Sequence, residues 1–346
     1  MFEPKYQLTP KILSNIFQIE RFYGQLEAMR TPLKLELDIE KHNLIQSSYI
    51  SNSVEGNPLS YPEVTNLLLG DRVPANRNEK EVKNYFEILK KLGNYTHQEL
   101  LVSQVIEIHR ELLTGTDDEI AGEIRNKEIV VGRYKSVDGK AKLLIKHNPP
   151  FHKRQEIENA LKELLNWANE EKEIPAVVRS GVFHHQFVYI HPFEDGNGRI
   201  CRLFTALILL SSGYLINKYF VLDDWYDIDR ILYSDKLHTA DNGDKTEWLE
   251  YFTDGIKYSL QSALGRFNTS FELMNFENRP TAKEKEVLKI FEIQKELTAP
   301  ELAQKLKVSR QQAHSLLSSL IDKGFLSKKG STKSSYYFLK KRGERV

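Results

Sequence analysis

The sequence contains few sulfur atoms and no long apolar run. Its 346 residues include one cysteine, Cys201, so an intramolecular disulfide framework is excluded. The longest apolar stretch, residues 203–210, is interrupted by Thr205 and is far too short to cross a bilayer. The first residues lack the apolar segment of a secretory signal. We therefore expect a soluble cytoplasmic protein with no membrane partner.

The net charge is also small, but it is unevenly distributed. Lys and Arg number 49 against 48 Asp and Glu, a net charge of +1. Residues 281–346 hold fifteen Lys and Arg but only seven Asp and Glu, a net of +8, which leaves −7 for the first 280 residues. The length suggests about two domains. The change in charge places a boundary at the connector-like residues 275–281.

Most of the chain has helical periodicity. Apolar residues recur at helix-like spacing in residues 100–113 and 157–167, and more weakly in 248–256. One region differs, because two β-prone runs, residues 128–134 and 140–146, flank an Asp-Gly pair that favours a tight turn. We predict a mainly α body that carries one exposed β-hairpin.

Residues 191–202, with the sequence HPFEDGNGRICR, combine several groups suited to phosphate chemistry. The Gly-Asn-Gly turn feeds the N-terminus of an apolar helix, where backbone N–H groups and the helix dipole favour an anion. Arg199 and Arg202 lie one turn apart and can bind the same polyphosphate. Asp195 offers the oxygen ligand that Mg²⁺ prefers, and His191 can accept a proton near neutral pH.

This segment resembles the Fic-domain signature, His-x-Phe-x-(Asp/Glu)-Gly-Asn-Gly-Arg-x-x-Arg, at every fixed position. The resemblance implies a protein adenylyltransferase that moves AMP from ATP to a Ser, Thr or Tyr hydroxyl of a target protein or of itself. It further implies that His191 is the general base and that Asp195 holds Mg²⁺. The phosphates would be bound by the remaining residues of the signature, namely Gly196, Asn197, Gly198, Arg199 and Arg202.

Wider features support the same resemblance. Residues 108–112 and 121–125 and the hairpin that ends in Pro149-Pro150 are similar to segments that precede the signature in Fic proteins. There the hairpin is a flap that pairs with an extended target segment. Tyr233 resembles a position near the adenine, although a core position is an alternative for this ring. His184 and His185 lack the spacing of a helical zinc site, so we expect packing or hydrogen-bonding roles for them.

Residues 51–57, SNSVEGN, resemble the Fic inhibitory motif, (Ser/Thr)-x-x-x-Glu-(Gly/Asn). Apolar periodicity before it, with Gly56 and Pro58 after it, independently predicts a helix that ends at Glu55. The resemblance implies that Glu55 pairs with Arg202 and blocks productive ATP binding. The inhibitory helix would span about residues 42–56.

The basic C-terminal segment resembles a winged helix. Three helix candidates, of which the second begins at a Thr298/Glu301 capping box, precede a two-stranded wing. In that arrangement Arg310 and the residues after it would face a DNA groove, although protein contacts are the alternative.

We therefore predict an N-terminal helical region (1–100), a Fic catalytic domain (101–275) and a winged helix-turn-helix domain (281–346). The expected partners are ATP with Mg²⁺, a target protein and, through residues 281–346, DNA. The alternatives are a Fic transferase with another phosphate-containing donor and a nucleotide-sensing transcription regulator. The sequence leaves open whether the chain forms a homodimer.

Overall fold

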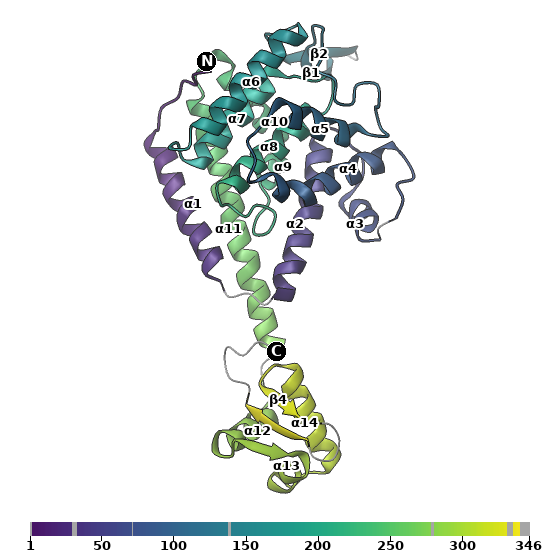
Figure 1. Cartoon of the computed structure of the whole chain (residues 1–346), viewed down its shortest axis with the longest axis vertical. Helices are drawn as coiled ribbons and strands as arrows, with labels where there is room; N and C mark the ends of the chain where they lie inside the picture. The colour runs from purple at the N-terminus through teal and green to yellow at the C-terminus, as the bar shows by residue number, and fades with distance from the viewer. Residues whose placement is uncertain are drawn as a thin grey trace. The chain divides into compact units, whose positions relative to one another are not determined.

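Figure 1 shows the computed structural model, which describes residues 2–29, 33–70, 72–137, 140–277, 280–330 and 335–339. The chain divides into two compact units, Met1–Arg266 and Phe267–Val346. The long helix α11 (Thr246–Glu277) contains the point of division. The predicted connector at 275–281 was wrong in its first residues, because 275–277 continue this helix. Residues 278 and 279 of that connector lie outside the described part of the chain.

The first unit is built almost entirely of helices, so the prediction of a mainly α body is confirmed. Besides the start of α11, its helices are α1 (Pro10–Ala28), α2 (Leu33–Val54), α3 (Tyr61–Leu69), α4 (Arg77–Lys91), α5 (Val102–Leu113), α6 (Arg154–Glu170), α7 (Ala176–Ile190), α8 (Asn197–Ser211), α9 (Asp224–Ile228) and α10 (Arg230–His238). Two short 3₁₀ helices, η1 (Leu92–Tyr95) and η2 (Thr239–Asn242), follow α4 and α10. No helix in the described ranges is long and apolar enough to cross a membrane.

Helices α7 and α8 form the centre of this unit: α6 packs against α7, and α2 and α5 pack against α8 (Figure 1). Both are buried on nearly every face, which explains why their sequences are apolar all round rather than on one stripe. Phe183, Phe187 and Phe204 are fully buried at their contact. This core fixes the loop that joins the two helices, residues 191–196, in one place.

The hairpin consists of strands β1 (Val131–Val137) and β2 (Lys140–His147), paired antiparallel. Its first strand begins later than predicted, because residues 128–130 are not paired with β2. A register shift follows Val131, where a side chain in place of Gly132 would lie 2.5 Å from the Leu144 carbonyl oxygen. The predicted turn residues Asp138 and Gly139 lie outside the described residues.

Helix α2 starts earlier than the helix predicted at 42–56, because residues 33–41 contain neither glycine nor proline to interrupt it. It ends at Val54, and Gly56 takes the left-handed conformation (φ 93°) that stops a helix. Glu55 therefore lies directly at the C-terminal end of α2.

The second unit contains α12 (Ala282–Ile293), β3 (Glu296–Thr298), α13 (Ala299–Leu306), α14 (Arg310–Asp322), β4 (Leu326–Lys329) and β5 (Tyr336–Leu339). Capping boxes begin α12, α13 and α14, and the second of them is the predicted Thr298/Glu301 pair. The two predicted wing strands are present as β4 and β5, paired antiparallel, and β3 adds a third strand in the order β3-β5-β4. Assignment of this unit as a winged helix stays a prediction.

Candidate active site

The loop between α7 and α8 begins at a strained residue. His191 caps α7 in the left-handed conformation (φ 50°), which is uncommon for a residue other than glycine. Gly196, also left-handed (φ 79°), then forms the N-cap of α8. Such strain persists only where surrounding contacts hold it, and it is typical of functional sites.

Arg125 supplies much of that support. Its guanidinium is almost fully buried and donates hydrogen bonds to the carbonyl oxygens of His191 (2.7 Å), Ile190 (3.1 Å) and Lys127 (2.8 Å). Its backbone N–H donates to the Pro192 carbonyl oxygen. One cation therefore satisfies the carbonyl groups at the end of α7 and fixes the position of His191.

The other end of the loop is closed by two side chains. Asn197 donates to the Phe193 carbonyl oxygen (2.8 Å) and accepts from the Phe193 N–H (2.9 Å). Phe193 is fully buried and stacks on His109, with ring centroids 3.7 Å apart. His109 Nε2 donates to the Asp195 carbonyl oxygen, while its Nδ1 accepts from the Gly122 N–H. Burial lowers the pKa of His109 to about 4, so it holds the loop as a neutral ring.

The ring of His191 is prepared to accept a proton. Its Nδ1 lies 3.2 Å from the Val188 carbonyl oxygen, and a carbonyl only accepts, so Nδ1 carries the hydrogen. The lone pair is then on Nε2. Burial lowers the pKa of His191 to about 4, which leaves the imidazole neutral at physiological pH. This is the state that a general base requires.

A candidate anion site adjoins His191 at the start of α8. The N–H groups of Asn197, Gly198 and Arg199 belong to the first turn and therefore have no acceptor within the helix. Arg199 and Arg202, both almost fully buried, lie one turn apart on the same helix. A polyphosphate bound here would meet the helix dipole and two planar cations.

Asp195 is the candidate metal ligand of the predicted set. Its carboxylate accepts from the Gly196 N–H (2.7 Å) and from Arg199 Nη2 (3.0 Å), and 42% of its side chain remains exposed. A carboxylate oxygen has more than one lone pair, so these bonds leave capacity for a cation. The residues present thus fit a Mg²⁺ ion that takes its other ligands from water and phosphate.

A carboxylate just beyond the end of α2 reaches into the candidate anion site. Glu55 Oε1 accepts from Arg202 Nη2 at 2.7 Å, and the same guanidinium bonds the Ser51 hydroxyl (2.7 Å) and carbonyl (2.8 Å) oxygens. A Cβ on Gly198 would lie 2.0 Å from Glu55 Oε1, so the carboxylate rests against the first turn of α8. The ion pair implied by the family resemblance is therefore present in the structure.

Tyr233 is buried in an aromatic cluster. Its ring stacks on Tyr226, with centroids 4.3 Å apart, and its hydroxyl bonds His184 Nε2 at 2.8 Å. His184 also bonds the Thr205 hydroxyl, as expected for a core histidine. These contacts place the Tyr233 hydroxyl in the core. That the Tyr233 ring lies near the adenine of ATP stays a prediction.

Sequence reasoning missed the roles of Arg125 and His109. Both lie in the segments 121–125 and 108–112 whose family resemblance we noted, but nothing in their local pattern shows what they bind. Their partners in the segment 190–195 are 65 to 86 residues away along the chain.

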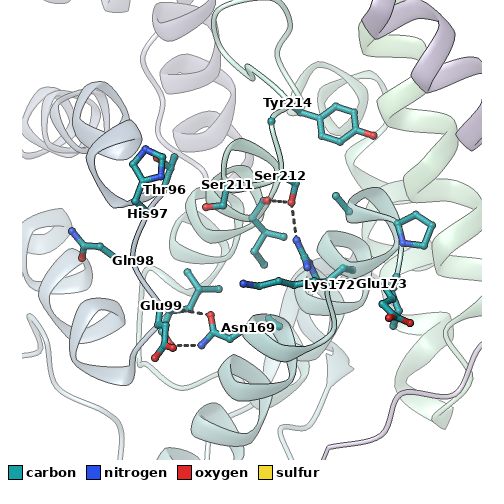
Figure 2. Close-up of a pocket in the computed structure, with 18 of the residues that line it drawn as sticks. Thr96, His97, Gln98, Glu99, Asn169, Lys172, Glu173, Ser211, Ser212 and Tyr214 are labelled. Carbon is teal, nitrogen blue, oxygen red and sulfur yellow. Dashed lines mark hydrogen bonds between the residues drawn. The ribbon is translucent and has the colours of Figure 1, made fainter.

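A large cavity of about 920 Å³ lies elsewhere in the first unit (Figure 2). It is lined by the segment from Thr96 to Leu100, the ends of α6 and α7, and residues 211–214. The buried guanidinium of Arg179 reaches it and donates to the Ser212 hydroxyl. No residue of the 191–202 motif lines this cavity, so it is separate from the candidate active site.

Comparison with known proteins agrees with the motif. Residues 99–209 match the sequence model of the Fic/DOC family. Protein adenylyltransferase fic-1 of Caenorhabditis elegans is 29% identical over 252 residues, covering 69% of this chain and 45% of that protein. Protein adenylyltransferase Fic of Culex quinquefasciatus is 26% identical over 273 residues, covering 73% and 49%. The chain thus spans about half the length of these curated relatives.

Solved structures show the same fold. A Fic family protein from Desulfovibrio desulfuricans G20 aligns with a TM-score of 0.68 at 23% identity, over 99% of this chain and 100% of that one. Fic-1 of C. elegans (residues 134–508) aligns with a TM-score of 0.61 at 22% identity, over 75% and 73%. The fold, the signature and the sequence match coincide on the same loop and helix. Residues 99–209 therefore match the Fic/DOC family in sequence, and the chain shares its fold with solved Fic proteins.

Proposed function

We propose that this chain is a protein adenylyltransferase that transfers AMP from ATP to a hydroxyl group of a target protein or of itself. The observation that carries the proposal is the neutral His191 ring, with Nε2 free, beside the anion site of α8. The names of the relatives, protein adenylyltransferase, support the same activity.

The chemistry is an in-line displacement at the α-phosphorus. His191 Nε2 takes the proton of the target hydroxyl as its oxygen bonds to phosphorus, and the bond to pyrophosphate breaks. The N–H groups of α8, with Arg199 and Arg202, hold the phosphates in place and stabilise the developing charge. Asp195 would hold Mg²⁺, which neutralises charge on the phosphates when bound.

Glu55 is the proposed brake. Its carboxylate pairs with Arg202 and lies against Gly198, so it occupies the position that the terminal phosphate of ATP would take. A phosphate brought there would meet a like charge and would lack the Arg202 guanidinium. ATP would then bind in a pose that does not present the α-phosphorus to the target hydroxyl.

The hairpin is the proposed docking strand for the target. Leu143, Leu144 and Ile145 of β2 are exposed, so an extended peptide could add to this ribbon and cover apolar surface. His147, the last residue of β2, bonds the Tyr189 carbonyl oxygen two residues before His191. A peptide on the hairpin would thus lie near the base.

DNA binding by residues 281–346 stays a separate prediction for the second unit. The residues expected to face a groove, Arg310, Gln311, Gln312 and His314, are exposed on α14. A salt-dependent mobility shift, lost on Arg310→Ala, would support it. Whether the chain forms a homodimer is a question for light scattering.

The test of the main proposal compares two labels. The chain is incubated with a peptide library and ATP that carries the label at either the α- or the γ-phosphate. AMP transfer predicts that α-label enters protein and γ-label does not, whereas phosphoryl transfer predicts the reverse. His191→Ala should abolish α-labelling, and the exposed His97→Ala should not. Absence of α-label in the wild type and in Glu55→Gly would overturn the proposal.

A further inference from the structure

A second group of ionisable side chains lies beyond the phosphate site. It consists of His147 at the end of β2, His238 at the end of α10 and Asp241 in η2. Each offers one ligand atom, and these atoms all lie within 4.8 Å of one another. Asp241 Oδ2 is 2.8 Å from His147 Nδ1 and 3.0 Å from His238 Nδ1. Two imidazole nitrogens and one carboxylate oxygen thus converge on a single point.

Neighbouring groups orient two of these side chains. His147 Nε2 lies 2.9 Å from the Tyr189 carbonyl oxygen and donates to it, which turns Nδ1 toward Asp241. Asp241 Oδ1 accepts from His185 Nε2 at 3.0 Å, and His185 Nδ1 in turn accepts from Lys245 Nζ at 2.7 Å. A histidine held by a carbonyl and a carboxylate held by a second donor are the outer contacts that metal ligands usually have.

The group is sheltered but remains open to solvent. The side chain of His147 is 3% exposed, that of His238 13% and that of Asp241 24%. A cation could therefore enter from the Asp241 side and keep a water molecule as a further ligand.

We propose that His147, His238 and Asp241 form a binding site for a divalent transition-metal cation of the zinc class. Two imidazoles and one carboxylate suit zinc or cobalt, whereas Mg²⁺ prefers an all-oxygen set. The site is distinct from Asp195 and does not depend on the proposed transferase activity. Its three ligands come from the hairpin, α10 and η2, so a bound cation would tie the base of the hairpin to the helical body.

The site also adjoins the loop of the proposed base. Tyr189, whose carbonyl accepts from His147, lies two residues before His191. Metal occupancy would therefore stiffen the segment that presents both the hairpin and His191. The inference predicts a structural metal rather than a participant in phosphate chemistry.

Cobalt absorption provides the direct test. The full-length chain is stripped with a chelator and titrated with Co²⁺, whose visible bands report a nitrogen- and oxygen-ligated site. We expect saturation at one equivalent, loss of the bands on adding Zn²⁺, and no loss in millimolar Mg²⁺. His238→Ala and Asp241→Asn should each weaken binding by at least about 100-fold, since even outer contacts are worth roughly 10- to 100-fold. The exposed His152→Ala should bind like the wild type.

Circular dichroism checks that each variant is folded. If Asp241→Asn does not fold, the test depends on His238→Ala. The proposal is overturned if the wild type shows no cobalt bands at stoichiometric concentration. It is also overturned if the bands persist in folded His238→Ala, because the cation would then be bound elsewhere. In either case the three side chains form only a hydrogen-bonded cluster.

Discussion

Replacing Glu55 by glycine gives the sharpest test of the proposed inhibition by this side chain. The wild-type carboxylate makes a charge-assisted hydrogen bond of 2.7 Å to Arg202, a guanidinium that is only 2% exposed. Bonds of this kind contribute roughly 1.5–3 kcal/mol. Because 32% of the Glu55 side chain is exposed, water screens the pair, and we take the lower part of that range, about 1.5–2 kcal/mol.

This free energy must be supplied each time Arg202 leaves Glu55 for a phosphate. Without the carboxylate this free energy is no longer needed. Every 1.4 kcal/mol corresponds to a change of about tenfold in an equilibrium constant. We therefore expect Glu55→Gly to raise kcat/KM for AMP transfer by about 10- to 30-fold. Glu55→Gln keeps an acceptor oxygen but no charge, so it should give a smaller increase.

The assay is the initial rate of α-label incorporation over a range of ATP concentrations. Glu40→Gly is the matched control, because it puts glycine into α2, the helix that ends just before Glu55, at a cost of about 1 kcal/mol and away from Arg202. It should leave the rate near the wild-type value. Equal rates for Glu55→Gly and the wild type would refute the reasoning. Equal increases in Glu55→Gly and Glu40→Gly would show that helix loosening, rather than loss of the carboxylate, is responsible.

Three further outcomes follow from buried groups near the loop. Arg125→Ala should leave the carbonyl groups of Ile190 and His191 without this donor. We expect the free energy of unfolding, measured by urea denaturation, to fall by about 3 kcal/mol, and the transfer rate, measured by α-labelling, to fall as well. The pKa of His109 is about 4 in the folded chain but about 6.5 when unfolded, so the unfolded state binds more protons between these values. Stability should therefore fall as the pH drops from 6.5 to 4, by up to about 1.4 kcal/mol per pH unit for each such histidine, and an unchanged urea midpoint would contradict this. Cys201 is fully buried, and burial raises its pKa, so a disulfide reagent should leave the native chain unmodified but react with one thiol in urea.

The helices and the loop motif could be predicted from the sequence because their determinants are local. Apolar spacing located α5, α6 and the first part of α11, and the Gly56 stop placed the end of α2 within one residue. The motif at 191–202 named the proposed base, the proposed anion site and the candidate metal ligand from consecutive residues. The start of α2 was missed because residues 33–41, which contain neither glycine nor proline, carry no sharp local signal of a helix boundary.

Only the tertiary structure decided which distant groups complete the site. The family resemblance implied the pairing of Glu55 with Arg202, but their contact spans 147 residues and no spacing rule yields it. The same holds for Arg125 beneath His191 and for His147 beside Asp241, which are 66 and 94 residues apart. Periodicity determines which face of a helix is buried, whereas packing of one helix against another determines which polar groups meet there. The sequence by itself thus specified the chemical groups of the loop. The fold decided which distant side chains support the loop, pair with its arginines and lie beside it.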